Sequence, residues 1–503
     1  DGDAFVDRVH AAPDEADLDH GAMVLDEAGV RGAAGGRADR RAVRATLDGG
    51  GDEIGEAALR RQEALGADGD VDLLVTRAGT ALPAGSPGYH ARLLLNDGRG
   101  GFTSAPPGML PALPLSVGAA AAADFDRDGH LDIVLGARVI PGKYPLPARA
   151  VLLAHRGGRF EDVTETHALF LKEVGLVSSA LWSDADGDGW PDLLLALEWG
   201  HVRLFRNLEG RGFEDVTERN GFARAGTGWW TSLAAADFNG DGRMDYVAGN
   251  AGLNTPYRAS EAEPAVMFHG TFSTGNATQV IDTIREAGQL YPRRTAKDIA
   301  AKIPAIRRQY PNNDDFARAT VEQVIGAERL AAAQRFEATE FRHGVFLSQA
   351  DGTWRFSPLP RLAQIAPIQG LHAGDVDGDG QADIVATQNS FSPIPFIGRF
   401  GGGLGQVLLG DGRGGFTPVE PGASGFVVPG DGKALVALDL NGDAAPDFVC
   451  SRNASSTLAF ENRPAPGRRF LQVRLRGTAG NAAGVGARVI LHLHDGRRQM
   501  AEI

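Results

Sequence analysis

Five segments of the chain place Asp or Asn at alternate positions 1, 3 and 5, with a further Asp at position 9. Oxygen side chains at this spacing surround one point when the chain turns tightly, and Ca²⁺ takes about six to eight oxygen ligands in a flexible cage. The pattern therefore predicts about five Ca²⁺ loops, in which position 7 contributes its main-chain carbonyl. The predicted ligands are Asp124, Asp126, Asp128, His130 and Asp132; Asp184, Asp186, Asp188, Trp190 and Asp192; Asp237, Asn239, Asp241, Arg243 and Asp245; Asp375, Asp377, Asp379, Gln381 and Asp383; and Asp439, Asn441, Asp443, Ala445 and Asp447.

The residues around these loops are those of strands. An EF-hand needs flanking helices and a Glu at position 12, whereas an apolar run such as Ile133 to Leu135 follows each loop directly. Small apolar residues such as Ala120 to Ala123 precede the loops. Each loop is therefore expected to join two short strands.

The five loops are not expected to bind equally. Position 6 is Gly129, Gly189, Gly242 and Gly380 in the first four loops but Ala444 in the last. If position 6 needs a positive φ, alanine costs roughly 1 kcal/mol there. Loop 439–447 is predicted to be the weakest site. Loops 184–192 and 375–383, which have four carboxylates and Gly at positions 4 and 6, are predicted to be the tightest.

A second repeated phrase accompanies the loops, and together the two patterns indicate the architecture. Leu93 to Phe102 and Val407 to Phe416 both read as a strand, an Asp/Gly turn and a strand that opens on an aromatic residue. The loops begin at intervals of 60 (124 to 184), 53 (184 to 237) and 64 (375 to 439) residues. Four short strands at this period indicate an all-β propeller. Weaker copies at 67–75 and 271–279 bring the count to seven blades, with six or eight as alternatives.

These motifs resemble FG-GAP, or VCBS, repeats, which form the blades of integrin-type propellers. The tail from Phe470, with Gly480-Asn-Ala-Ala-Gly484-Val-Gly486-Ala-Arg488, resembles the start of an ASPIC and UnbV domain. Repeats followed by such a tail are the layout of the cartilage acidic protein family. The resemblance spans roughly residues 65–503. It implies a secreted, cell-surface or periplasmic protein of bacterial type with a truncated ASPIC and UnbV domain.

Composition agrees with that interpretation. The net charge of −14 argues against nucleic acid and anionic membrane surfaces as partners. The loops supply four, four, three, four and three of the 64 acidic residues, so much of the acidity belongs to predicted metal ligands. The single cysteine, Cys450, excludes a disulfide framework within the chain and is expected to be a buried apolar residue. No run of about 20 apolar residues predicts a membrane span.

The expected domains follow from these patterns. Residues 1–60 have weak apolar periodicity and are predicted to be poorly ordered or a degenerate blade. Residues 61–465 form the propeller, and 466–503 the start of the tail domain. Residues 285–341 break the strand rhythm, with helices expected at 296–308 and 314–341, and form a helical insertion that packs on the propeller or binds a partner.

No catalytic motif emerges from the sequence. The histidines share no spacing, and metalloprotease, serine hydrolase and P-loop motifs are absent. A carboxylate that binds Ca²⁺ stays ionised and cannot act as a general acid. The favoured function is a non-enzymatic, Ca²⁺-stabilised extracellular scaffold for protein or glycan recognition. The alternative is a propeller lyase or hydrolase acting on polysaccharide. Trp182, Trp190, Trp199, Trp229 and Trp230 are expected to pack between blades, with a sugar-stacking patch as the alternative.

Overall fold

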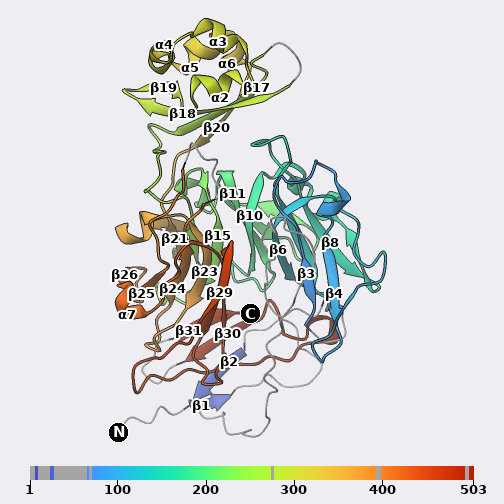
Figure 1. Ribbon diagram of the computed structural model, residues 1–503. Helices are drawn as coiled ribbons and strands as arrows, with labels where there is room; N and C mark the ends of the chain where they lie inside the picture. Colours follow the sequence, from blue (N-terminus) through green and yellow to red (C-terminus); the bar gives the residue numbers. More distant parts are fainter. Residues whose placement is uncertain are drawn as a thin grey trace.

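The computed structural model describes residues 6–9, 23–27, 65–66, 71–273, 277–391, 398–492 and 498–503. Strands dominate these residues and form a series of mainly antiparallel sheets, with short helices between them (Figure 1). The all-β propeller architecture is therefore confirmed.

A blade is a meander of short strands paired in chain order. One blade consists of β6 (Ser116–Ala123), β7 (Asp132–Val139), β8 (Ala150–Arg156) and β9 (Arg159–Asp162). The register pairs Ala123 with Asp132, so the acidic loop is the turn between the first two strands. Apolar residues occupy both faces of β7, and nearly all of that strand is buried, because it lies inside the blade and packs against β10 of the next blade.

The other blades follow the same plan. Their strands are β3 (Leu73–Val75), β4 (Arg92–Asn96) and β5 (Phe102–Ser104); β10 (Leu176–Ser183), β11 (Asp192–Gly200), β12 (Val202–Asn207), β13 (Phe213–Asp215) and the added β14 (Gly228–Trp229); β15 (Ser232–Ala236), β16 (Asp245–Gly249), β21 (Gly344–Ser348) and β22 (Trp354–Pro358); β23 (Ile368–Gly374), β24 (Asp383–Gln388), β25 (Gln406–Gly410) and β26 (Phe416–Val419); and β27 (Asp431–Leu438), β28 (Asp447–Asn453) and β29 (Ser455–Phe460). Short helical turns lie between strands: η1 (Pro87–Tyr89), α1 (Thr164–His167), η2 (Leu169–Glu173), η3 (Phe222–Ala225), η4 (Arg361–Ile365), α7 (Pro421–Ser424) and η5 (Ala479–Asn481).

The inner strands surround a central cavity of about 1850 Å³. Small residues on these strands let several sheets approach one axis. Within the described residues, six blade sheets line the cavity, one fewer than the seven blades predicted from the repeat count, and residues between Gly467 and Ile503 line it as well. Representative wall residues, one from each sheet, are Leu73, Ala120, Ala180, Ala234, Leu371 and Val436.

The repeat at 271–279 lies in an insertion outside the ring, which accounts for the difference. The insertion leaves the propeller after β16 and returns at β21, two strands that pair directly with each other. Its strands β17 (Ala265–Gly270), β18 (Gln279–Glu286), β19 (Gln289–Pro292) and β20 (Gln334–Ala338) form a separate sheet. Figure 1 shows this sheet and its helices projecting from one end of the propeller.

In its described residues the insertion contains five short helices instead of the two longer ones predicted. They are α2 (Ala296–Ala300), α3 (Ala305–Gln309), α4 (Asn313–Arg318), α5 (Val321–Ile325) and α6 (Ala327–Ala331). The predicted helix at 314–341 is broken because Thr320 starts a new helix with a capping box and Gly326 ends it at φ 93°. Phe316, Val321 and Val324 pack into the core of the insertion.

A last sheet joins segments from opposite parts of the chain. It contains β1 (Val6–Val9), β2 (Met23–Glu27), β30 (Arg488–His492) and β31 (Arg498–Glu502), with β2 parallel to β30. The prediction for residues 1–60 falls mostly outside the described residues, although β1 and β2 lie within that range. Figure 1 places this sheet at the end of the propeller opposite the insertion.

Candidate metal centres in the inner loops

Four of the five acidic loops are turns held by their own first aspartate. In loop 124–132, Asp124 accepts hydrogen bonds from the N–H groups of Asp128 at 3.0 Å and Gly129 at 2.9 Å. Gly129 has φ 88°, a left-handed conformation that glycine adopts without strain. The first aspartates of three further loops make the same pair of contacts; these residues are Asp237, Asp375 and Asp439.

The aspartate at position 9 connects the loop to the third strand of the blade. In loop 184–192, Asp192 is 1% exposed. Its Oδ2 accepts the N–H of Ala185 at 3.0 Å, and its Oδ1 accepts the N–H of Asn207 at 2.7 Å. The equivalent aspartates, each with its two N–H donors, are Asp132 with Phe125 and His155, Asp245 with Phe238 and Ser348, Asp383 with Val376 and Gly410, and Asp447 with Leu440 and Asn462.

The two weaker repeats keep part of this brace without the acidic loop. Asp72 accepts the N–H of Asn96 at 3.0 Å and also that of Gly66. In the insertion, Gln279 Oε1 accepts the N–H of Phe272 at 2.8 Å, seven residues earlier, as in the acidic loops. The position-9 contact therefore belongs to the fold of the repeat, whereas the acids at positions 1, 3 and 5 are additional.

Burial makes the position-9 carboxylates hard to ionise while no cation is present. Desolvation, reinforced by neighbouring aspartates, raises the pKa of Asp132 and Asp192 to about 8. The pKa of Asp245 and that of Asp383 are raised to about 7, again chiefly by desolvation. A bound cation would favour the ionised forms of all four groups.

Three loops bring carboxylates together closely enough to share an ion. Oxygens from positions 1, 3 and 9 lie within 4.8 Å of one another in these loops. Ligands at about 2.5 Å from Ca²⁺ lie at most about 5 Å apart, so the spacing fits a common ion. In addition, Asp184 Oδ1 is buried and has no hydrogen-bond partner among the residues that the structure describes. The three sets are Asp124, Asp126 and Asp132; Asp184, Asp186 and Asp192; and Asp375, Asp377 and Asp383.

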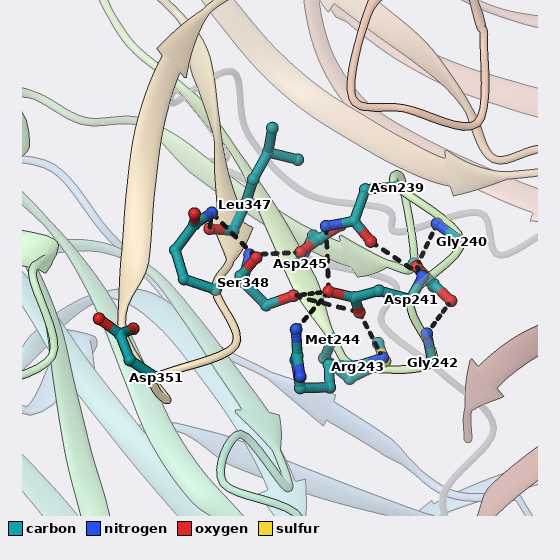
Figure 2. Close-up of polar contacts among 12 residues, drawn as sticks. Asn239, Gly240, Asp241, Gly242, Arg243, Met244, Asp245, Leu347, Ser348 and Asp351 are labelled. Atoms are coloured by element: carbon teal, nitrogen blue, oxygen red, sulfur yellow. Dashed lines mark hydrogen bonds and ion pairs between the residues drawn. The ribbon is translucent and has the colours of Figure 1, made fainter.

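The two remaining loops carry an asparagine at position 3. Figure 2 shows loop 237–245, where Asn239 Nδ2 donates to Asp241 Oδ2 at 3.3 Å. Ser348 of β21 donates its hydroxyl to Asp241 at 3.1 Å and its N–H to Asp245. In loop 439–447, Asn441 makes the corresponding contact with Asp443 at 2.9 Å. These loops therefore offer fewer charged oxygens to a cation.

Positions 5 and 7 occupy the outer part of each loop. The N–H of position 7 donates to the carboxylate of position 5, which turns the chain back toward the blade. The pairs are His130 with Asp128, Trp190 with Asp188, Arg243 with Asp241, Gln381 with Asp379, and Ala445 with Asp443, at 2.8 to 3.0 Å.

Arginines lie over two of the acidic loops, and the sequence analysis did not identify them. Arg206 of β12 donates to Asp186 Oδ2 at 2.5 Å and to Asp188 Oδ2 at 3.1 Å. Arg156 of β8 makes equivalent ion pairs with Asp126 and Asp128. Both arginines lie in the second repeated phrase. An arginine in the strand next to an acidic loop is the sequence feature that could have predicted these ion pairs. Their charges partly offset those of the carboxylates.

The tryptophans do not form a single patch. Trp182 and Trp230 are buried in two different cores. Trp199 and Trp229 pack edge to face at 5.3 Å, beside residues of the insertion junction such as Phe341. Trp190 lies instead at a loop, 4.1 Å below the guanidinium of Arg127. This arrangement favours packing over sugar stacking.

Basic side chains also reach the central cavity. Arg138 and Lys433 line it, and each forms an ion pair, with Glu198 and with Asp431 respectively. His372 also lines the cavity and packs edge to face on Phe448 at 5.4 Å. The paired charges give the wall a structural role in addition to any contact with a ligand.

The comparisons with known proteins support the repeat assignment. The model of the FG-GAP-like repeat matches residues 66–135, 184–248 and 342–386. These ranges do not include residues 466–503, so the likeness to ASPIC and UnbV stays an expectation. No curated protein matches the sequence. In the described residues, we find no helix with the length and apolar character needed to cross a membrane.

Solved structures resemble the chain only distantly. The biofilm matrix protein Bap1 of V. cholerae has 11% identity and a TM-score of 0.28, over 82% of this chain and 89% of its own. Sqt1 of Saccharomyces cerevisiae has 12% identity and a TM-score of 0.34, over 78% and 81%. BBS1N, solved in complex with ARL6DN, has 10% identity and a TM-score of 0.26, over 77% and 92%. TM-scores this low imply nothing about function.

Proposed function

We propose that the protein is a calcium-stabilised extracellular scaffold that binds a protein or glycan partner without catalysing a reaction. The observation that carries the proposal is the gathering of three carboxylates within 4.8 Å in each of three loops. Carboxylates at that distance repel one another, and burial increases the cost. A divalent cation at each loop would remove this repulsion and stabilise the blade.

The chemistry of the donors favours Ca²⁺ over other cations. All side-chain donors at positions 1, 3, 5 and 9 are oxygens, which suit Ca²⁺ and Mg²⁺ rather than softer metals. Ca²⁺ accepts the irregular geometry of such a turn, whereas Mg²⁺ demands a near-ideal octahedron, which favours the larger ion. Extracellular calcium modules have a Kd of about 10⁻⁴ to 10⁻³ M, so the proposed location, secreted or at a cell or periplasmic surface, provides enough calcium.

Thermal melting of the intact chain in millimolar Ca²⁺, in Mg²⁺ and in EDTA tests the stabilising role. A ligand that binds only the folded state stabilises it by RT ln(1 + [L]/Kd), which is about 1.4 kcal/mol per site for 1 mM Ca²⁺ and a Kd of about 10⁻⁴ M. We expect the melting temperature to fall by many degrees in EDTA and to recover with Ca²⁺ more than with Mg²⁺. Identical melting curves in Ca²⁺ and EDTA would refute this role.

Recognition and the absence of catalysis need separate assays. A glycan array and a pull-down from the extracellular fraction, each in Ca²⁺ and in EDTA, should identify a partner whose binding requires the folded propeller. The same protein incubated with acidic and neutral polysaccharides should release no new reducing or unsaturated ends. Release of such ends would replace the scaffold proposal with the lyase or hydrolase alternative.

A further inference from the structure

The last part of the chain lies against the loop face of the propeller. We call residues 467–503 the tail, described here except for 493–497. In Figure 1, strands β30 and β31 of the tail lie at the end of the propeller opposite the insertion. The tail contacts the three loops whose carboxylates gather. Its contacts are Thr478 with the Gly129 carbonyl at 2.9 Å, Arg468 with the Gly378 carbonyl at 3.3 Å, Gln499 with Asp375 at 3.4 Å, and Arg488 and Glu502 with Asp184.

The contact with loop 184–192 has the most complete geometry. Arg488 donates to the main-chain carbonyl of Asp184 at 2.7 Å and lies 3.0 Å from its Oδ2. Glu502, which pairs with Arg488 across β30 and β31, accepts the N–H of Asp184 at 3.3 Å. It also accepts the hydroxyl of Ser183 at 2.5 Å. The tail therefore holds the first residue of the loop by its backbone and by one carboxylate oxygen.

The other oxygen of Asp184 remains available. Oδ1 is buried without a hydrogen-bond partner, whereas in loop 124–132 both oxygens of Asp124 accept loop N–H groups. Arg488 thus contacts one oxygen of the carboxylate, Oδ2, and leaves the other, Oδ1, without a hydrogen bond. Arg206 bonds to Oδ2 of Asp186 and of Asp188, whose Oδ1 atoms already accept loop N–H groups, so it leaves no oxygen of these carboxylates without a hydrogen bond. The two arginines act differently on the same loop.

Charge points to the same arrangement. Five carboxylates, the four of the loop and that of Glu502, face three guanidinium groups, those of Arg127, Arg206 and Arg488, so carboxylates outnumber cations and a divalent cation offsets the excess. Apolar contacts also hold the tail, because Met500 packs with the core that contains Tyr246, and Val485 with the core that contains Leu131. The tail is therefore anchored independently of the loop and can report changes at Asp184.

We infer that Arg488 and Glu502 are positioning residues for a cation at loop 184–192, so that cation binding and docking of the tail stabilise each other. The inference rests on the proposed calcium binding. It adds that the tail is part of the calcium site at loop 184–192 and is more than a neighbouring domain. Thermodynamic linkage requires the effect to be reciprocal: calcium protects the tail, and a docked tail tightens calcium binding.

Hydrogen exchange of the intact chain measures the first half of the linkage. We expect amides of β31 to exchange about tenfold more slowly in Ca²⁺ than in EDTA, a typical size for coupling between sites. Amides of β17 and β18 in the insertion serve as the internal reference and should not change. Calorimetric titration of the same sample with Ca²⁺ measures binding independently.

The two measurements separate the possible failures. If calcium binds but the exchange of β31 is the same in Ca²⁺ and EDTA, the linkage is wrong and the scaffold proposal stands. If no calcium binds, the proposed function fails and the inference fails with it. Neither result depends on a variant being able to fold.

Variants test the second half of the linkage. The step missing from the titration of Asp188→Ala identifies loop 184–192. Arg488→Ala should weaken that step about tenfold and speed exchange of β31, while Arg474→Ala, an exposed arginine of the same tail, should change neither. Circular dichroism checks that both variants are folded. Faster exchange with an unchanged calcium step would assign Arg488 a merely structural role and overturn the inference.

Discussion

Asp192 Oδ1 accepts the N–H of Asn207 at 2.7 Å and thereby holds an acidic loop to the third strand of its blade. The other oxygen of the same carboxylate accepts the N–H of Ala185 inside the loop. Since Gln279 repeats the loop half of this brace in a turn that has no acids, the brace does not require a metal. Positions 9 and 3 of one loop should therefore respond differently to mutation.

In EDTA, Asp192→Ala should destabilise the protein by about 2 to 3 kcal/mol, because two buried N–H groups lose their acceptor. Asp186→Ala, in the same loop, should cost less than about 1 kcal/mol in EDTA, because its ion pair with Arg206 is partly exposed. In saturating Ca²⁺, both variants should lack the stabilisation that this loop provides. Thermal melting of both variants and of the unsubstituted protein, in Ca²⁺ and in EDTA, measures the loss of stability for each variant in each condition. Equal losses for the two variants in EDTA would contradict the different roles of positions 9 and 3.

Stability without metal should fall as pH rises. Asp132 and Asp192 have a pKa of about 8 in the folded chain, against about 3.9 when unfolded. Between these values the folded state binds more protons than the unfolded state, so each unit of rising pH destabilises the fold. A buried histidine such as His343, whose pKa is lowered to about 4, acts in the opposite direction below its unfolded value.

The comparison of Ca²⁺ with EDTA at each pH removes the histidine contribution, which is common to both samples. We expect the melting temperature gained from Ca²⁺ to increase from about pH 5 to about pH 8, because protons compete with the cation for the same carboxylates. A gain that is constant across this range would show that the position-9 aspartates are already ionised without metal.

The sequence was sufficient to locate the loops and the strands that flank them, because both depend on residues close together in the chain. It could not identify Asn207 as the partner of Asp192, since that contact depends on how β11 pairs with β12. The favoured count of seven blades, rather than the alternative of six, exceeds the number of blades in the described residues for a related reason. The repeat around Gln279 keeps its local turn, but where β17 and β18 lie is decided by the insertion core around Phe316.

Arg206 should weaken calcium binding at loop 184–192. Its guanidinium bonds to the Oδ2 atoms of Asp186 and Asp188, which are the expected ligands of the cation. Arg206→Ala should therefore tighten the calcium step of this loop, by up to about tenfold if about 1.4 kcal/mol of competition is removed. Arg219→Ala removes an exposed ion pair with Glu214 and is the matched control. A weaker step in Arg206→Ala would mean that the arginine supports the site.

The arginine also refines the predicted order of the sites. The two loops predicted to be tightest differ in the side chain that donates to the aspartate at position 5. In loop 184–192 it is the charged Arg206, whereas in loop 375–383 the neutral amide Nε2 of Gln381 donates to Asp379 Oδ2 at 2.9 Å. We therefore expect it to fill before loop 184–192. Titrations of Asp379→Ala and Asp188→Ala should show loss of the highest-affinity step only in the former. Loss of that step in Asp188→Ala alone would restore the opposite order.

Ala444 is expected to limit the last loop. It has φ 69°, the left-handed conformation that glycine adopts at the same position in the other loops. Its N–H lies 3.2 Å from Asp439 Oδ2, compared with 2.8 Å for Gly380 and Asp375 Oδ2. Ala444→Gly should relieve roughly 1 kcal/mol of strain, which slows local opening of loop 439–447 about fivefold in hydrogen exchange. It should also tighten the weakest calcium step.

Ala459→Gly is the matched control, because Ala459 is an exposed residue of β29 in the same blade and has no positive φ. There, glycine should destabilise by about 0.5 to 1 kcal/mol and speed local exchange. The opposite signs of the two alanine-to-glycine changes isolate the backbone conformation as the cause. If both changes speed exchange, the loop does not store strain at Ala444, and the low affinity expected for this site must come from Asn441 alone.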